Sequence, residues 1–171
     1  SYRTVRDAIS DIQDIKPGKE VTDSYFTLPP HPEAQGLEKE LRGRCLHNHI
    51  TTATRETALS RFKALKAGEN FHDLSPELKT TYSNAERTQN TIYMRLKYDE
   101  PSGTVVNVRK SMWIHPELDR AISIREAARL QTFPDSFIFE GTKDSQYQQV
   151  GNAVPPFLAK AVAESIIGIL D

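Results

Sequence analysis

The chain has 171 residues, of which 37% are hydrophobic and 26% are charged, and its formal net charge is −1. This composition is typical of a folded globular protein and excludes a disordered chain. No apolar run reaches the roughly 18 residues that a membrane span needs, and the first residues lack an apolar secretion core. A single cysteine, Cys45, excludes an internal disulfide framework and fits a reducing cytoplasm, which is the location we expect.

The charge is distributed unevenly along the chain. Residues 42–97 carry ten Lys and Arg against five Asp and Glu. Residues 1–41 carry five Lys and Arg against eight Asp and Glu. A basic middle section is what a phosphate-binding surface requires, but a merely solvated basic face explains the same pattern equally well. The charge alone therefore leaves nucleic-acid binding open.

Helices separated by loops are predicted for the first 80 residues. Thr4 with Asp7 three residues later signals a helix start, so a short helix is expected over residues 5–12. Residues 16–44 are rich in Pro and Gly and predict loops. A longer helix is expected within residues 54–68, where apolar side chains recur at helical spacing. Those side chains are Ala58, Leu59, Phe62 and Leu65, and Ser75 with Pro76 signals the start of a further helix.

Strands are predicted for the section after Asn90. In residues 91–98 apolar and polar positions alternate, which is the pattern of a half-buried strand. The inward positions would be Ile92, Met94, Leu96 and Tyr98, and the outward ones Tyr93, Arg95 and Lys97. After a turn at the EPSG tetrapeptide, residues 104–108 and 111–114 are expected to form further strands.

The last fifty residues return to helix. Ser123 with Glu126 predicts a capping box at the start of a helix that Pro134 limits. A proline pair opens a final amphipathic helix over residues 157–170. Its apolar stripe consists of Leu158, Ala161, Val162, Ile166 and Ile169. These elements predict an α+β fold in three segments, 1–44, 45–122 and 123–171.

Two stretches of the sequence resemble a known family. Residues 115–139 read HPELDRAISIREAARLQTFPDSFIF and residues 147–163 read YQQVGNAVPPFLAKAVA. In this order and at this distance they resemble motifs IX and X, the last two motifs of DNA cytosine-5 methyltransferases. Residues 4–12 are similar to the segment that follows motif VIII in bacterial members. Residues 61–78 and 93–107 are similar to the variable target-recognition region, so the resemblance covers essentially the whole chain.

The resemblance assigns a role to each predicted segment. Residues 1–44 would be the helix and linker after motif VIII, and residues 45–122 the target-recognition domain. Residues 123–171 would pack on a Rossmann-like methyltransferase core supplied by another stretch of polypeptide. We therefore expect the first and last helices to leave apolar faces uncovered, and the chain to self-associate or to need a partner.

Methyl transfer to C5 of cytosine requires a thiolate nucleophile with a depressed pKa and a base rotated out of the duplex. In the family this cysteine follows a proline, and a glutamate in an ENV triplet steadies the base. Cys45 instead follows Arg44, no ENV triplet occurs, and none of the eight glycines forms a close pair for a cofactor loop. We therefore assign no catalytic residue to this chain and expect it to be inactive alone. An N-terminal catalytic domain or subunit carrying motifs I to VIII would be its partner.

The asparagine of motif X lies beside S-adenosylmethionine in the family. The resemblance therefore implies that Asn152 contacts this cofactor, with Ala153 and Val154 in the same segment, and that Gly151 lets the backbone approach closely. From the residues alone, Asn152 could equally cap a helix or a turn.

Two polar loops are expected to contact double-stranded DNA, because Arg, Gln and Asn side chains read base edges in the major groove. The candidate residues are Arg87, Gln89 and Asn90 in residues 83–90, and Asn107 and Arg109 in residues 107–111. Any one of them taken singly could be an ordinary polar turn residue.

Two further positions are carried over from the family. Thr104 resembles a threonine that contacts a DNA phosphate near the target cytosine. Arg125 is similar to the motif IX arginine that ties the recognition domain to the core, and we count it among the DNA-binding candidates. Its position beside Glu126 allows a purely structural ion pair equally well.

Other functions are weaker hypotheses. Cys45, His47 and His49 lack the usual spacing of a zinc site, so no metal is expected. The leading prediction is part of a DNA cytosine-5 methyltransferase in a bacterial restriction–modification system. The alternative is a sequence-specific DNA-binding module without catalysis, against which the VGNAVPP segment argues because it serves the cofactor pocket in the family.

Overall fold

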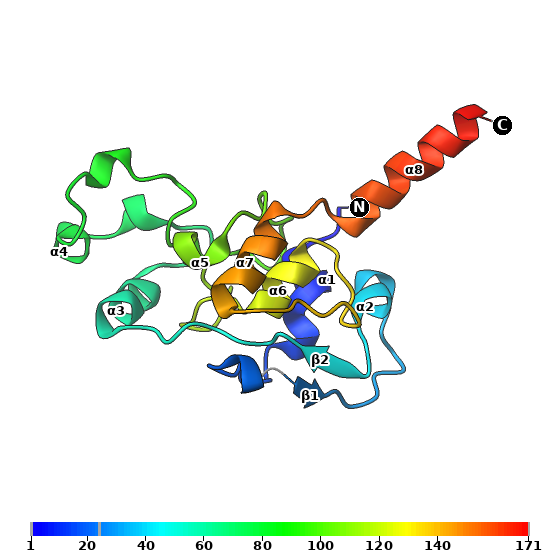
Figure 1. Ribbon diagram of the computed structural model, residues 1–171. Helices are drawn as coiled ribbons and strands as arrows, with labels where there is room; N and C mark the ends of the chain where they lie inside the picture. Colours follow the sequence, from blue (N-terminus) through cyan, green and yellow to red (C-terminus); the bar gives the residue numbers. More distant parts are fainter. Residues whose placement is uncertain (1, 24, 171) are drawn as a thin grey trace.

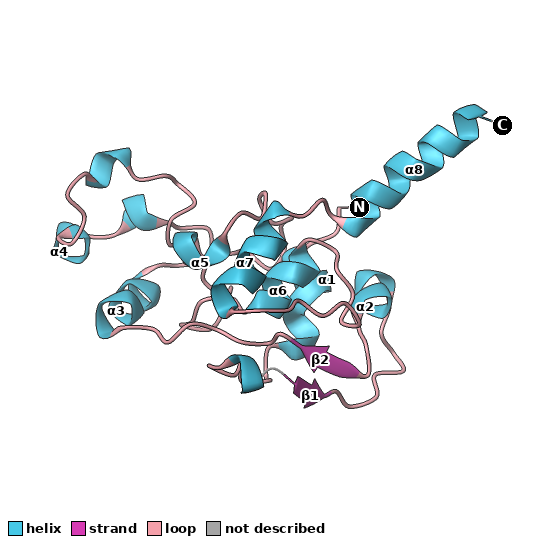
Figure 2. Cartoon of the chain, in the orientation of Figure 1, coloured by secondary structure: helices cyan, strands magenta, loops and turns pink. Residues whose placement is uncertain are grey.

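The computed structural model describes residues 2–23 and 25–170 and is mainly helical (Figure 1). The helices are α1 (Val5–Ile9), α2 (Gly36–Leu41), α3 (Glu56–Ala64), α4 (Pro76–Lys79), α5 (Val108–Ser111), α6 (Ile124–Leu130), α7 (Lys143–Asn152) and α8 (Pro156–Leu170). Short 3-10 turns occupy Ser10–Ile12, Val21–Asp23, Phe71–Asp73 and Ala85–Arg87. The strands β1 (Tyr25–Thr27) and β2 (Cys45–His47) pair antiparallel, with Phe26 opposite Leu46, at one edge of the molecule (Figure 2).

The predicted mixture of helices and strands is confirmed, but the strands predicted between residues 91 and 114 are wrong. The strand pairing in that section is limited to isolated bridges, from Ile114 to Arg95 and to Ala121, and part of the section forms helix α5 instead. Tyr93 and Met112 adopt φ angles of 53° and 51°, in the left-handed region, which interrupts an extended chain.

The alternation of inward and outward side chains also fails in this section. Tyr93 and Arg95, which the sequence pattern places outside, are buried. The guanidinium of Arg95 points inward and donates hydrogen bonds to four backbone carbonyl oxygens of neighbouring loops, those of Phe62, Leu65, His115 and Leu118. The section is therefore an irregular layer rather than a sheet, and Arg95 and a few backbone hydrogen bonds connect its loops.

Helix α1 begins with the predicted capping box. The Thr4 hydroxyl accepts a hydrogen bond from the backbone N–H of Asp7, whose carboxylate accepts one from the Thr4 backbone N–H. The apolar face of α1 packs against α2 and α6, and Val5 and Ile9 are buried. The expectation that this first helix leaves an apolar face uncovered is therefore wrong.

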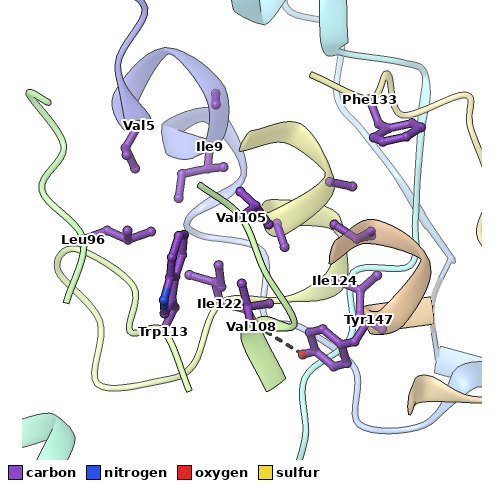
Figure 3. Packing of buried hydrophobic residues seen from close by; sticks show 14 of the residues in the cluster. Val5, Ile9, Leu96, Val105, Val108, Trp113, Ile122, Ile124, Phe133 and Tyr147 are labelled. Atoms are coloured by element: carbon purple, nitrogen blue, oxygen red, sulfur yellow. Dashed lines mark hydrogen bonds between the residues drawn. The ribbon is translucent and has the colours of Figure 1, made fainter. Parts of the chain in front are cut away.

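The main hydrophobic core draws on each of the three predicted segments (Figure 3). It combines Val5 and Ile9 with Leu96, Trp113, Ile124 and Tyr147, among others. A second cluster lies around Phe62, Phe71 and Tyr93, between α3 and the irregular layer. The division of the chain into three segments stays a prediction, and in this structure the segments share one core.

The C-terminal helix α8 extends away from the rest of the molecule (Figure 1). Its predicted apolar stripe is confirmed as uncovered, since Leu158, Val162, Ile166 and Ile169 are between 51% and 82% exposed. No helix within the described ranges has the length and apolarity that a bilayer crossing would demand. An apolar face of this size needs a covering surface to be stable in water.

Candidate donor-closing segment and nucleic-acid interface

Helix α7 positions the segment that contains Gly151 and Asn152, and the sequence patterns did not predict this helix. The Thr142 hydroxyl accepts a hydrogen bond from the backbone N–H of Ser145 and so caps its first turn. Tyr147 and Val150 anchor its inner face in the main core. The helix ends at Asn152, and an extended turn over residues 153–155 leads to α8.

The turn after α7 is fixed on one side and open on the other. The Gln131 side chain donates a hydrogen bond to the carbonyl oxygen of Val150 at 2.9 Å. Asn152 and Val154 are exposed, Val154 to 64%, while Ala153 packs partly against the core. A small amide and two small apolar side chains therefore border an open surface, which fits one edge of a binding site for a polar ligand.

Gly151 allows two backbone segments of this chain, helix α7 and residues 106–107, to pack closely together. A Cβ atom at this position would lie 2.8 Å from the carbonyl carbon of Val106 and 2.9 Å from the backbone nitrogen of Asn107. Only glycine allows α7 to pack so tightly on the segment that leads into α5. The close approach expected toward a cofactor is thus used for packing against residues 106 and 107.

A chain of side-chain amides connects Asn152 to α5. The Gln148 amide donates to the Oδ1 atom of Asn152 and accepts from the Nδ2 atom of Asn107, each at 3.1 Å. Asn107 in turn caps α5, since its Oδ1 atom accepts a hydrogen bond from the Lys110 backbone N–H. The structure therefore joins one predicted DNA-contacting residue to the predicted cofactor contact through Gln148, which sequence reasoning did not single out.

The predicted DNA-contacting loops lie in different parts of the molecule. Residues 104–111 approach α7, where Arg109 forms an ion pair with Asp144. Residues 83–90 follow α4 in the outlying part of the chain shown in green in Figure 1. The candidate side chains of Arg87, Gln89, Asn90, Thr104 and Arg109 are exposed, and that of Asn107 is half-buried. Exposure keeps these residues as candidates, and their DNA contacts remain predictions.

Arg125 is buried in this structure rather than part of an exposed interface, and its assignment as a DNA contact stays a prediction. Its side chain is 0% exposed. The guanidinium donates to the carbonyl oxygens of His47, Pro134 and Phe137 and to the side chain of Asn48. Burial lowers the pKa of Arg125 to about 10, so it stays charged at neutral pH. Arg125 therefore ties β2 and the residue after it to the loop that follows α6.

Arg125 and Glu126 do not form the ion pair that the sequence allowed. Glu126 instead accepts two hydrogen bonds from Arg120 and one from the Ser123 backbone N–H, which completes the predicted capping box. Burial opposes ionisation of Glu126, but the charge and hydrogen bonds of Arg120 outweigh it and lower the pKa of this carboxyl to about 2. Beside it, burial lowers the pKa of His115 to about 4, although the charge of Glu126 opposes this shift.

The residues weighed as zinc ligands have other partners. His49 is buried, and its two ring nitrogens lie within hydrogen-bonding distance of the Ser123 hydroxyl and the Ile15 carbonyl oxygen. The Cys45 sulfur lies 3.2 Å from the Tyr25 hydroxyl oxygen. Across the part of the chain that is described, no three potential ligands gather to hold a metal ion.

Comparisons with known proteins show which family the chain resembles. Type II methyltransferase M.DdeI of Desulfomicrobium norvegicum is 35% identical over 96% of this chain and 43% of its own length. DNA (cytosine-5)-methyltransferase 4 of Arabidopsis thaliana is 33% identical over 95% of this chain and 12% of its own length. The chain thus spans less than half of these curated relatives.

A solved structure shares the fold. A prophage-encoded Escherichia coli protein, described as a DNA modification methyltransferase, superposes with a TM-score of 0.74 at 24% identity. The match covers 99% of this chain and 48% of that protein. The sequence profile described as C-5 cytosine-specific DNA methylase matches residues 5–168. The chain therefore belongs to the C-5 cytosine-specific DNA methylase family.

Proposed function

We propose that this chain supplies DNA recognition and closes the cofactor pocket of an S-adenosylmethionine-dependent DNA cytosine-5 methyltransferase. Family membership supports the reaction class, and the Pro-Cys nucleophile, ENV triplet and glycine loop that the reaction needs are not in this sequence. We place those groups on a catalytic portion of the enzyme, joined to this chain or present as a separate subunit. The type II designation of M.DdeI supports a restriction–modification context.

The observation that carries the proposal is the open turn at residues 152–154 next to the uncovered stripe of α8. An aliphatic stripe in water and an exposed asparagine beside it are what a docking surface would present. The catalytic portion would cover α8 and thereby bring the Asn152 amide to the edge of the donor site. A DNA-binding module without catalysis, the alternative function, would need neither the uncovered stripe of α8 nor the exposed Asn152.

Each part of the chain would have a definite task in the reaction. S-adenosylmethionine supplies the methyl group when it is bound. The Asn152 amide can donate to and accept from a polar group of the donor, and its orientation is held by Gln148. The exposed side chains of residues 83–90 and 104–111 would contact base edges and phosphates. The chain's own residues thus bind and orient, and they perform no bond-making step.

Reconstitution tests the proposal. A polypeptide carrying the Pro-Cys and ENV groups of the family is added to this chain, and transfer of a labelled methyl group to DNA is measured. We expect transfer only when both are present. Absence of transfer to any DNA, with DNA binding retained, would support the non-catalytic module instead.

A substitution then separates the two tasks. Asn152→Ala should weaken donor binding by the reconstituted enzyme about tenfold, the loss of one hydrogen bond to a charged or polar group, without changing DNA affinity. Gln149→Ala is the matched control, because Gln149 lies on the same helix and its side chain donates to Glu140 and Ser145 rather than to Asn152. A change in DNA affinity alone would contradict the assignment of Asn152 to the donor site.

A further inference from the structure

A cavity of about 490 Å³ lies between the start of α3 and α5. The charged side chains that line it are all positive: among the described residues four cationic side chains line the cavity and no carboxylate does. These cations are Arg55, Arg61, Arg109 and Lys110. Arg109 is paired with Asp144 of α7, so three of the four lack a carboxylate partner among the described residues. A concave surface of this kind favours an anion.

Arg61 is the unusual member of the set. Its side chain is 5% exposed, and among the described residues its guanidinium donates only to uncharged oxygens, those of Leu78, Tyr93 and Thr81. It also lies 5.2 Å from the ring centroid of Tyr93. A buried cation without a counter-charge is costly, and an anion entering the cavity would offset that cost.

The N-terminus of α3 and the hydroxyl of Thr52 also line this cavity, and both can form hydrogen bonds with further partners. Helix α3 spans nine residues, and its N-cap, Arg55, makes no side-chain capping bond. Thr57 and Ala58 of its first turn line the cavity, where the helix dipole favours negative charge. The Thr52 hydroxyl also lines it, is shielded from solvent and has no hydrogen-bond partner among the described residues. Buried hydroxyls are rarely left unpaired, so a ligand oxygen would satisfy it.

We propose that this cavity binds a phosphate group, and that in the enzyme the phosphate belongs to the DNA backbone beside α5. The chemistry follows from the guanidinium, ammonium and hydroxyl groups, which together suit a tetrahedral oxyanion. The source of the phosphate rests on the proposed function. Lys110 and Arg109 on the cavity wall belong to residues 107–111, one of the two loops expected on DNA. The cavity thus fixes the register of the duplex and reads no base.

The first test measures binding of a fluorescent duplex to the purified chain at several salt concentrations. The double variant Arg55→Gln/Lys110→Gln removes two exposed cavity charges without touching the buried Arg61. We expect about tenfold weaker binding near 0.1 M salt, equal on duplexes of different sequence, and a salt slope smaller by about one. The control Lys63→Gln/Lys66→Gln removes two exposed charges on or next to α3 that do not line the cavity, and should change affinity less than about twofold.

The second test uses inorganic phosphate and needs no DNA. Phosphate should raise the melting temperature of the wild-type chain by roughly 2 °C over chloride at equal ionic strength, and the cavity variant should lose this rise. Equal melting temperatures of all variants in chloride establish that folding is intact. If the cavity variant loses the phosphate effect while no duplex binds the wild type, the phosphate site stands and the DNA part of the proposed function fails.

Two outcomes overturn the inference. Loss of the phosphate effect with unchanged duplex affinity would assign the cavity to a free phosphate compound rather than to DNA. Equal behaviour of the cavity variant and the control in both tests would show that the cavity binds no phosphate.

Discussion

Helix α6 buries charged side chains, whereas helix α8 exposes aliphatic ones. Arg125, Glu126 and Arg129 of α6 are each 0% exposed, while Ile166 and Ile169 of α8 are 53% and 82% exposed. The two arginines donate to carbonyl groups and carboxylates of the same chain, and Glu126 accepts from the guanidinium of Arg120. The side chains of α8 have no comparable cover in the described structure. The contrast shows that α6 organises this chain internally, and it supports the proposal that α8 docks on a surface outside the described residues.

The largest expected effect comes from breaking the charge network of α6. Arg129 donates to both carboxylate oxygens of Asp135, at 2.9 and 2.7 Å, and also pairs with Asp11. Arg129→Met would take away the cation that Asp135 binds through both oxygens. Among the described residues, this buried carboxylate would be left with only the 3.8 Å ion pair to Arg125, while Asp11 would keep Arg42. We expect the free energy of unfolding to fall by about 3–5 kcal/mol, measured by urea denaturation.

The control for Arg129 lies on α8. Lys160→Met removes a cation that forms an exposed ion pair with Glu164, and it should change the free energy of unfolding by less than about 0.5 kcal/mol. Similar losses for both variants would contradict the contrast between the two helices.

Substitution of one glycine in α7 and one in α8 compares the helix that packs on the core with the helix that projects from it. Gly151→Ala would place a Cβ atom 2.8 Å from the Val106 backbone, so α7 must shift, and we expect a loss of about 1–3 kcal/mol. Gly168→Ala in α8 would meet nothing within 4 Å and should stabilise the helix by up to about 1 kcal/mol. Thermal unfolding of the two variants measures the difference. If Gly151→Ala left the stability unchanged, the tight contact between α7 and the Val106 backbone would be refuted.

The stability of the chain should also fall in mild acid because of the network around α6. The folded-state pKa of His115, about 4, lies below its ordinary value of 6.5, so the unfolded chain binds a proton more readily. The His115 contribution is complete above pH 6.5 and is lost progressively as the pH falls toward 4. Between pH 7.5 and pH 5 the free energy of unfolding should drop by about 2 kcal/mol.

The His115→Gln variant is the control for this pH dependence. Urea midpoints at several pH values should show a flatter profile between pH 6.5 and 5 than for the wild type. The folded-state pKa of Glu126 is also lowered, so its contribution disappears only below its ordinary value of 4.5. An unchanged profile in His115→Gln would assign the acid sensitivity to other groups.

Local signals in the sequence predicted helix starts well. The capping boxes at Thr4 and Ser123 both form, because each depends only on residues three positions apart. The strand pattern in residues 91–98 failed because the fate of Arg95 is decided by carbonyl groups 20 to 33 residues away. Alternation along the chain carries no information about such distant acceptors.

The candidate site was predictable only in part for the same reason. The VGNAVPP segment marks Asn152, but its connection through Gln148 to Asn107 joins residues 41 positions apart. The basic cavity likewise combines residues near position 55 with residues near position 110. The basic charge of residues 42–97 was visible in the sequence, whereas the concave surface that concentrates it required the folded chain.

The smallest expected effect on stability, and the most informative one about function, comes from α8. Ile166→Gln with Ile169→Gln changes side chains that are already in water, so the free energy of unfolding of the chain should change by less than about 0.5 kcal/mol. The same variant should weaken self-association or docking of the catalytic portion at least tenfold, because burying two isoleucines is worth several kcal/mol. Analytical ultracentrifugation of the chain alone and with the catalytic portion measures both.

Glu164→Gln, on the polar face of α8, should leave association unchanged. If the isoleucine variant unfolded more easily while association stayed the same, α8 would have to pack on its own chain in solution. In that case the contrast with α6 would disappear, and the proposed role of residues 152–154 at the donor site would need a different partner surface.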